Sequence, residues 1–129
     1  MRDNYRQIQN ILQLMIEEGN GFISEYKGYK YEIIRVSHSG HLCGYIYMDK
    51  ATDKEFEIME SNFHGGVTWG FGIEPQEGKY GFDCAHCYDL RPLDLFADTG
   101  VMDSMEYRTM DYVEECLKNT IDLLIESKK

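Results

Sequence analysis

Apolar residues near the start of the chain recur at three- and four-residue steps, which is the spacing of one face of an α-helix. This pattern predicts a helix from about Asn4 to Glu18. Its apolar stripe would consist of Tyr5, Ile8, Ile11, Leu12, Met15 and Ile16. The run Gly19-Asn20-Gly21 follows directly, and these residue types tolerate the left-handed backbone that often ends a helix. We therefore expect the helix to stop there.

A second stretch with helical spacing lies at the end of the chain. It predicts a helix that Asp103 or Ser104 caps and that ends near Ser127. If Asp103 is the cap, Glu106 stands three residues further on, as in a capping box. The buried stripe of this helix would consist of Met110, Val113, Leu117, Ile121, Leu124 and Ile125.

Between the helices, aromatic and β-branched residues predict strands. Phe22–Tyr26 and Tyr29–Val36 read as a hairpin, with Lys27-Gly28 as its turn. Leu42–Met48 predicts a third strand in which Gly44 marks a bulge. Two histidines, His38 and His41, fall in the loop before this strand, and we expect both at its surface rather than as ligands.

The middle of the chain is less regular. Glu55–Glu60 alternates apolar and polar residues, which favours a short strand. Val67–Ile73 and Lys79–Cys84 predict a second hairpin, and the segment 74–78 supplies proline and glycine for its turn. No period holds from Cys87 to Gly100, which therefore reads as a long surface loop of the kind that often carries function.

This order of elements predicts a single α+β domain over residues 1–129. Its antiparallel sheet of five or six strands would carry the N- and C-terminal helices on one face. No apolar run approaches the roughly 20 residues of a membrane span, and the polar start is not a signal peptide. We therefore expect a cytoplasmic protein with reduced thiols, among which Cys116 is a small buried hydrophobe.

The charge of the chain narrows the classes of partner. The sequence has 23 acidic and 13 basic residues, a formal net charge of −10. Such a field repels phosphate backbones, so generic binding of DNA or RNA is disfavoured. It favours a basic protein surface as partner, although acidic surfaces also serve solubility alone.

Two central segments hold most of the residues with chemistry. Asn62–Trp69 contains His64, and Tyr80–Asp89 contains Cys84 and His86. If the second hairpin forms, these residues would lie near one another. Thiolate and imidazole ligands at this spacing suit tetrahedral zinc, with Cys87 as a further ligand where the chain turns. A second Cys-x-x-Cys pair is missing from the sequence, so the zinc pattern is incomplete.

The same residues permit two other interpretations. A thiol enzyme would use Cys84 as nucleophile, a histidine as base, and Asp83 or Asp89 to orient the imidazole, with oxyanion donors in the backbone of the diglycine. A binding pocket without chemistry would use glycines for close backbone approach, and aromatics, a histidine and an arginine to hold a small polar ligand. The structural alternative is that Trp69 and Phe82 belong to the core and that the glycines only permit a tight bend.

Three motifs resemble those of a group of small phage and prophage proteins. They are His64-Gly65-Gly66-Val67-Thr68, then Gly81-Phe82-Asp83-Cys84-Ala85-His86 with Asp89, and then Tyr107-Arg108-Thr109 before a Val-Glu-Glu helix. The resemblance covers roughly residues 29 to 125, and Cys87 and Tyr88 depart from it because the group has small residues there. We predict a ligand-binding site formed by His64, Gly65, Gly66, Trp69, Phe82, Asp83, Cys84, His86, Asp89 and Arg108.

Small phage proteins of this kind often counter host defence, by blocking an effector or by sequestering a signalling nucleotide. The resemblance therefore implies a binding protein whose partner is a host defence protein or a small signalling nucleotide. The acidic charge favours the protein, and the central stretch with Arg108 favours the nucleotide. The competing class is a small zinc- or cysteine-dependent hydrolase. Apart from that zinc we expect no cofactor, and we expect a homodimer formed through an exposed face of the terminal helices.

Overall fold

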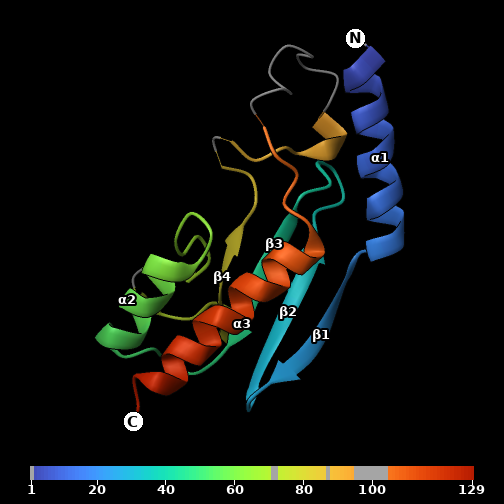
Figure 1. Cartoon of the computed structure of the whole chain (residues 1–129). Coiled ribbons are helices and arrows are strands. Elements are labelled where there is room, and N and C mark those ends of the chain that lie inside the picture. Colours follow the sequence, from blue (N-terminus) through green and yellow to red (C-terminus); the bar gives the residue numbers. More distant parts are fainter. Residues whose placement is uncertain (1, 71–72, 87, 95–104) are drawn as a thin grey trace.

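The computed structural model describes residues 2–70, 73–86, 88–94 and 105–129. These residues form an α+β fold with one antiparallel sheet (Figure 1). In chain order the elements are α1 (Arg2–Glu18), β1 (Gly21–Tyr26), β2 (Tyr29–Arg35), β3 (Leu42–Tyr47), α2 (Asp53–Asn62), β4 (Lys79–Asp83), the short 3-10 helix η2 (Pro92–Asp94) and α3 (Met110–Glu126).

The sheet has the simple strand order β1-β2-β3-β4, and each strand pairs with its neighbour in the chain. The first helix and the first three strands lie where the sequence predicts them. The expectation of five or six strands was not met, since four strands occur in the described part of the chain. Gly44 is not a bulge, because it pairs regularly with Ile33 on one side and Phe82 on the other.

The predicted strand Glu55–Glu60 was wrong, because this segment lies in α2. Thr52 caps the helix, and Glu55 returns a hydrogen bond to the cap, which completes a capping box. Phe56, Met59 and Phe63 all pack in the core, and their spacing is helical. The alternation that suggested a strand was too short to outweigh this longer pattern.

The second predicted hairpin is only partly formed. β4 provides one side, but the other contributes a single bridge, in which Trp69 pairs with Gly81. Residues 71–72 lie outside the described part. In the loop predicted after β4, Pro92–Asp94 forms one 3-10 turn. Trp69 lies edge-on to Tyr45 on the face of the sheet that points away from α3, with their ring centroids 6.0 Å apart.

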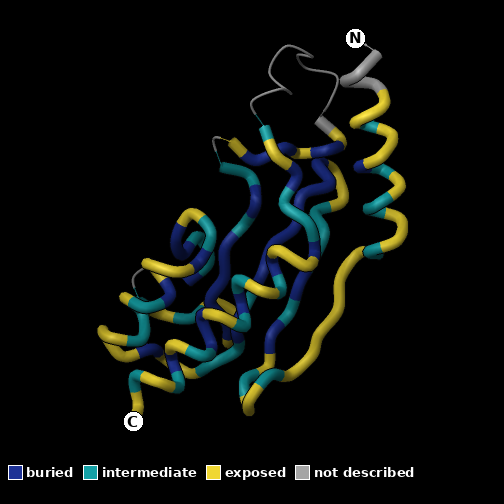
Figure 2. The backbone as a smooth tube through the Cα atoms, viewed as in Figure 1, coloured by how far each residue is buried: buried dark blue, intermediate teal, exposed yellow. Residues whose placement is uncertain are grey.

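The core lies between the sheet and α3, which crosses strands β2 and β3, with α2 beside it (Figure 1). The residues that α3 buries include Met110, Val113, Leu117, Ile121 and Leu124, as its sequence pattern predicts. Gly44 permits this close packing: a Cβ there would lie 2.9 Å from the Phe82 ring and 3.0 Å from Val113. Figure 2 shows that most residues of β3 and β4 are buried and that most residues of β1 are exposed.

α3 begins later than predicted. Thr109 caps it, and its hydroxyl accepts a hydrogen bond from the Tyr112 amide. The expected caps, Asp103 and Ser104, lie outside the described residues. Glu106 is not part of the helix but forms a parallel bridge with Asp89. This bridge brings the segment before α3 against the segment after β4.

The prediction that α1 packs beside α3 on one face of the sheet was wrong. α1 lies at one end of the sheet instead (Figure 1). Its Ile11 joins a second, smaller core with Leu90 and Tyr107. At the end of α1, Glu18 forms a buried ion pair with Arg35 at 3.0 Å. None of the described helices is both long and apolar enough to cross a membrane.

Candidate functional site

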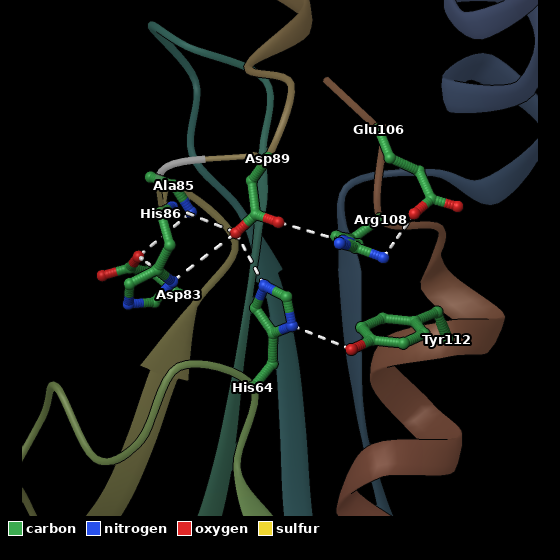
Figure 3. Close-up of polar contacts among 8 residues, drawn as sticks. All are labelled: His64, Asp83, Ala85, His86, Asp89, Glu106, Arg108 and Tyr112. Carbon is green, nitrogen blue, oxygen red and sulfur yellow. Dashed lines mark hydrogen bonds and ion pairs between the residues drawn. The ribbon is translucent and has the colours of Figure 1, made fainter. Parts of the chain in front are cut away.

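Three segments that are distant in the sequence meet at one buried carboxylate (Figure 3). His64 follows α2, Asp89 follows β4, and Arg108 precedes α3. Asp89 Oδ2 lies 2.6 Å from His64 Nε2, and Asp89 Oδ1 accepts a hydrogen bond from Arg108 Nε at 2.9 Å. His86 packs beside them, with its ring centroid 5.6 Å from that of His64. We call His64, His86, Asp89 and Arg108 the histidine–aspartate–arginine cluster.

The turn after α2 positions His64. The Gly66 amide donates to the Phe63 carbonyl at 2.9 Å, which closes a tight turn around His64 and Gly65. Gly65 and Gly66 have φ angles of 74° and 88°, a left-handed conformation that side chains other than glycine rarely adopt. The two glycines therefore allow the chain to turn sharply just after the helix and to present the histidine to Asp89.

Gly65 also makes room for His86. A Cβ at Gly65 would lie 2.4 to 2.7 Å from three atoms of the His86 ring, which is too close for any side chain. Gly66 similarly makes room for Glu60, whose carboxylate accepts from the Val67 amide at 3.0 Å. The diglycine thus shapes the cluster directly.

Asp89 is the most buried member, with 2% of its side chain exposed. Burial alone would raise the pKa of its carboxyl, but hydrogen bonds from Arg108, His64 and the His86 amide lower it below its ordinary value. Asp89 is therefore ionised at neutral pH and acts only as an acceptor. It follows that His64 Nε2 donates to Asp89 Oδ2, while its Nδ1 lies 2.8 Å from the Tyr112 hydroxyl.

Arg108 is held on both sides. Besides its hydrogen bond to Asp89, Arg108 donates from Nη1 to Glu106 Oε2, and its guanidinium lies 5.2 Å from the centre of the Tyr112 ring. Neither Tyr112 nor this role of Glu106 was predicted from the sequence. Tyr112 lies in the first turn of α3, whereas Arg108 precedes the helix, so no helical spacing in the sequence pointed to their contact.

His86 is bound differently from the other members. Its Nδ1 lies 3.5 Å from Asp89 Oδ2 and 3.7 Å from Asp83 Oδ1, yet it makes no hydrogen bond and is shielded from solvent. Asp83 is half-exposed and accepts from the Ala85 amide at 3.1 Å. A buried imidazole nitrogen that makes no hydrogen bond, although two carboxylates lie within 4 Å, is uncommon in a folded protein.

Cys84 does not belong to this cluster. Only 1% of it is exposed, and it packs in the main core, on the same side of β4 as Phe82. Burial, and the negative charge of Asp89, raise the pKa of its thiol. Because a thiolate is required for attack or for zinc binding, this environment disfavours both expected roles of Cys84. Cys87 lies outside the described residues.

The remaining predicted residues are placed as follows. Phe82 is a core residue, and Trp69 lies on the other face of the sheet, where its indole N–H donates to the Gln76 carbonyl at 2.9 Å. His38 is exposed as expected. The surface position expected for His41 was wrong, since His41 is buried with its Nδ1 2.6 Å from the Ser39 hydroxyl.

No protein-family model, curated protein or solved structure matches this chain. The geometry alone therefore defines the candidate site. It is a buried aspartate that orients two histidines and an arginine at the start of α3, in an α+β protein with one four-stranded sheet in the described part of the chain.

Proposed function

We propose that this chain is a small phage-type binding protein that interferes with host antiviral defence by binding a basic surface of a defence protein. The observation that supports a protein partner is an acidic groove on the exposed side of α3. We use this name for the shallow depression of about 470 Å³ that is lined by Tyr26, Asp111, Glu114, Glu115, Lys118, Asn119 and Asp122.

The groove carries four carboxylates and one ammonium group. Two of the carboxylates have partners: Glu114 accepts from the Tyr31 hydroxyl, and Asp122 forms an exposed ion pair with Lys27 at 2.8 Å. Asp111 and Glu115 are exposed, and their negative charges favour a cationic ligand. Together with the net charge of −10, this favours a partner rich in arginine and lysine, because complementary fields steer association.

The alternative partner, a signalling nucleotide, has less support from the cluster. Arg108 is the cation of the cluster, and it is already held by Asp89 and Glu106. A phosphate would have to displace one of these carboxylates while approaching the other. The electrostatic arrangement therefore favours cations over anions at the cluster, and a protein over a nucleotide as the partner of the whole chain.

A matched pair of charge reversals tests the proposal. Glu115→Lys changes the groove, and Glu57→Lys makes the same change on the exposed side of α2. Each variant is expressed in bacteria that carry one defence system from a panel, and plaque formation by a restricted phage is counted. We expect the wild type and Glu57→Lys to restore plaques against one system, and Glu115→Lys to lose this effect.

The purified defence protein identified in this way gives the second measurement. Its affinity for the wild type should fall steeply between low and high salt, because binding rests on exposed charges. Equal plaque counts for Glu115→Lys and Glu57→Lys, or an affinity that does not change with salt, would contradict the groove as the binding surface. Failure of the wild type against every system in the panel would contradict the defence role.

A further inference from the structure

We propose that His64, His86 and Asp89 form a binding site for one divalent transition-metal ion. One ligand atom from each of these residues lies within 4.8 Å of the others. Two imidazole nitrogens and a carboxylate oxygen are ligands that zinc and its neighbours in the first transition row accept. This site is separate from the acidic groove, so the inference does not depend on the proposed partner.

The distances suit a single ion with little movement. Ligand atoms bound to one tetrahedral zinc at about 2.0–2.2 Å stand roughly 3.4 Å apart. His86 Nδ1 and Asp89 Oδ2 are 3.5 Å apart, close to this spacing. His64 Nε2 and Asp89 Oδ2 are nearer, at 2.6 Å, because they share a proton. Entry of a metal ion would release that proton and let the two atoms separate.

The nitrogen of His86 is the independent observation that points to a ligand. Its Nδ1 is buried and has no hydrogen-bond partner. The ring can occupy this position only because Gly65 has no side chain. A buried polar atom without a hydrogen-bond partner destabilises the folded state, because it has lost its bonds to water. A metal ion would accept the lone pair of this nitrogen and remove that penalty.

The residues around the three ligands already have the arrangement that metal sites require. The Tyr112 hydroxyl contacts the distal nitrogen of His64, and Arg108 holds Asp89 Oδ1, which leaves Asp89 Oδ2 directed at the two histidines (Figure 3). Such outer contacts fix the orientation of ligands in metalloproteins. Asp83 Oδ1, 3.7 Å from His86 Nδ1, or a water molecule can complete the coordination. Both histidines of the sequence-based zinc hypothesis belong to this site, and Asp89 takes the place expected for Cys84, which lies in the core.

The test uses the purified full chain, stripped with a chelator and titrated with Co²⁺ and then with Zn²⁺. We expect a visible Co²⁺ spectrum that saturates at one ion per chain and is displaced by Zn²⁺. His86→Ala should weaken binding by more than about 100-fold, since loss of an outer-shell group alone costs roughly 10–100-fold. Tyr112→Phe, which removes only such a group, should fall within that smaller range.

His38→Ala is the matched control, because His38 is an exposed loop histidine outside the cluster. It should bind as the wild type does. His86→Ala is expected to fold, since the ring nitrogen it removes makes no hydrogen bond, and circular dichroism and thermal unfolding check this. The proposal is overturned if the wild type takes up no stoichiometric metal. It is equally overturned if folded His86→Ala and Tyr112→Phe bind as tightly as His38→Ala.

Discussion

At the scale of single residues, Gly65 decides whether His86 can lie beside Asp89. Its backbone is left-handed, with φ of 74°, and the His86 ring occupies the space where its side chain would begin. The backbone conformation and the contact with His86 can be studied separately. Gly78 has nearly the same φ, 76°, but no atom lies within 4 Å of the place where its Cβ would be. Substitutions at Gly65 and Gly78 therefore distinguish backbone strain from a steric clash with the His86 ring.

We predict that Gly78→Ala destabilises the protein by about 1 kcal/mol, from strain alone, and that Gly65→Ala costs more because the His86 ring must move. Urea denaturation gives both free energies of unfolding. Gly65→Ala should also abolish stoichiometric Co²⁺ binding, whereas Gly78→Ala should keep it. Equal unfolding free energies with equal metal binding would show that His86 does not depend on Gly65.

Cys84 gives a second prediction at this scale. Because it is buried and burial raises the pKa of its thiol, it should resist iodoacetamide in the native protein at pH 8. Peptide mapping after brief labelling should find Cys84 unmodified, and labelling in urea should modify it fully. Rapid labelling of Cys84 under native conditions would restore the thiol-enzyme hypothesis.

The residues of the cluster could be identified from the sequence in part. His64, His86, Asp89 and Arg108 stand out by their chemistry, and they do meet. Cys84 was misplaced because β4 ends at Asp83: Cys84 stays in the core, whereas His86 lies past the end of the strand, beside Asp89. Tyr112 was missed because nothing in the sequence shows that the first turn of α3 faces His64.

At the scale of elements, Glu18 holds α1 to the rest of the fold. Its carboxylate pairs with the buried guanidinium of Arg35 and accepts from the Tyr107 hydroxyl and from the Met110 amide at 2.7 Å. One side chain therefore joins α1, β2 and the start of α3. The sequence predicted these elements from their periodicity. The docking of α1 at the end of the sheet combines the polar contacts of Glu18 with the apolar contacts of Ile11, and periodicity reveals neither set of partners.

We predict that Glu18→Ala destabilises the fold by about 3–5 kcal/mol, because it leaves the charge of Arg35 buried without its partner. The neighbouring exposed residue supplies the control: Glu17→Ala should change stability by less than about 0.5 kcal/mol. Chemical denaturation monitored by circular dichroism compares them. A loss below about 1 kcal/mol for Glu18→Ala would mean that Arg35 finds another partner or reaches water.

At the scale of the whole molecule, exposed apolar side chains bear on self-association. Ile16 on α1 is 75% exposed and Leu123 on α3 is 43% exposed, so both terminal helices present apolar residues to solvent. Ile23, on the outer side of β1, is 53% exposed and provides a comparison away from these helices. The homodimer expected from the sequence stays a prediction, and these residues show where its interface would lie.

Sedimentation equilibrium at micromolar concentration should give twice the chain mass of 15.1 kDa. Ile16→Glu should shift the population to monomer, because it places a charge in the proposed contact, and Ile23→Glu should leave the dimer intact. A single species of 15.1 kDa for the wild type would rule out the dimer at these concentrations.

The position of Glu18 has a consequence for how the chain is made. Its partners Tyr107 and Met110 follow it by 89 and 92 residues, so α1 cannot complete its contacts until that part of the polypeptide has been synthesised. Contacts between residues so far apart form slowly, because a long loop must close first. α1 thus leaves the ribosome well before its partners and is expected to reach its native place only after they have been made.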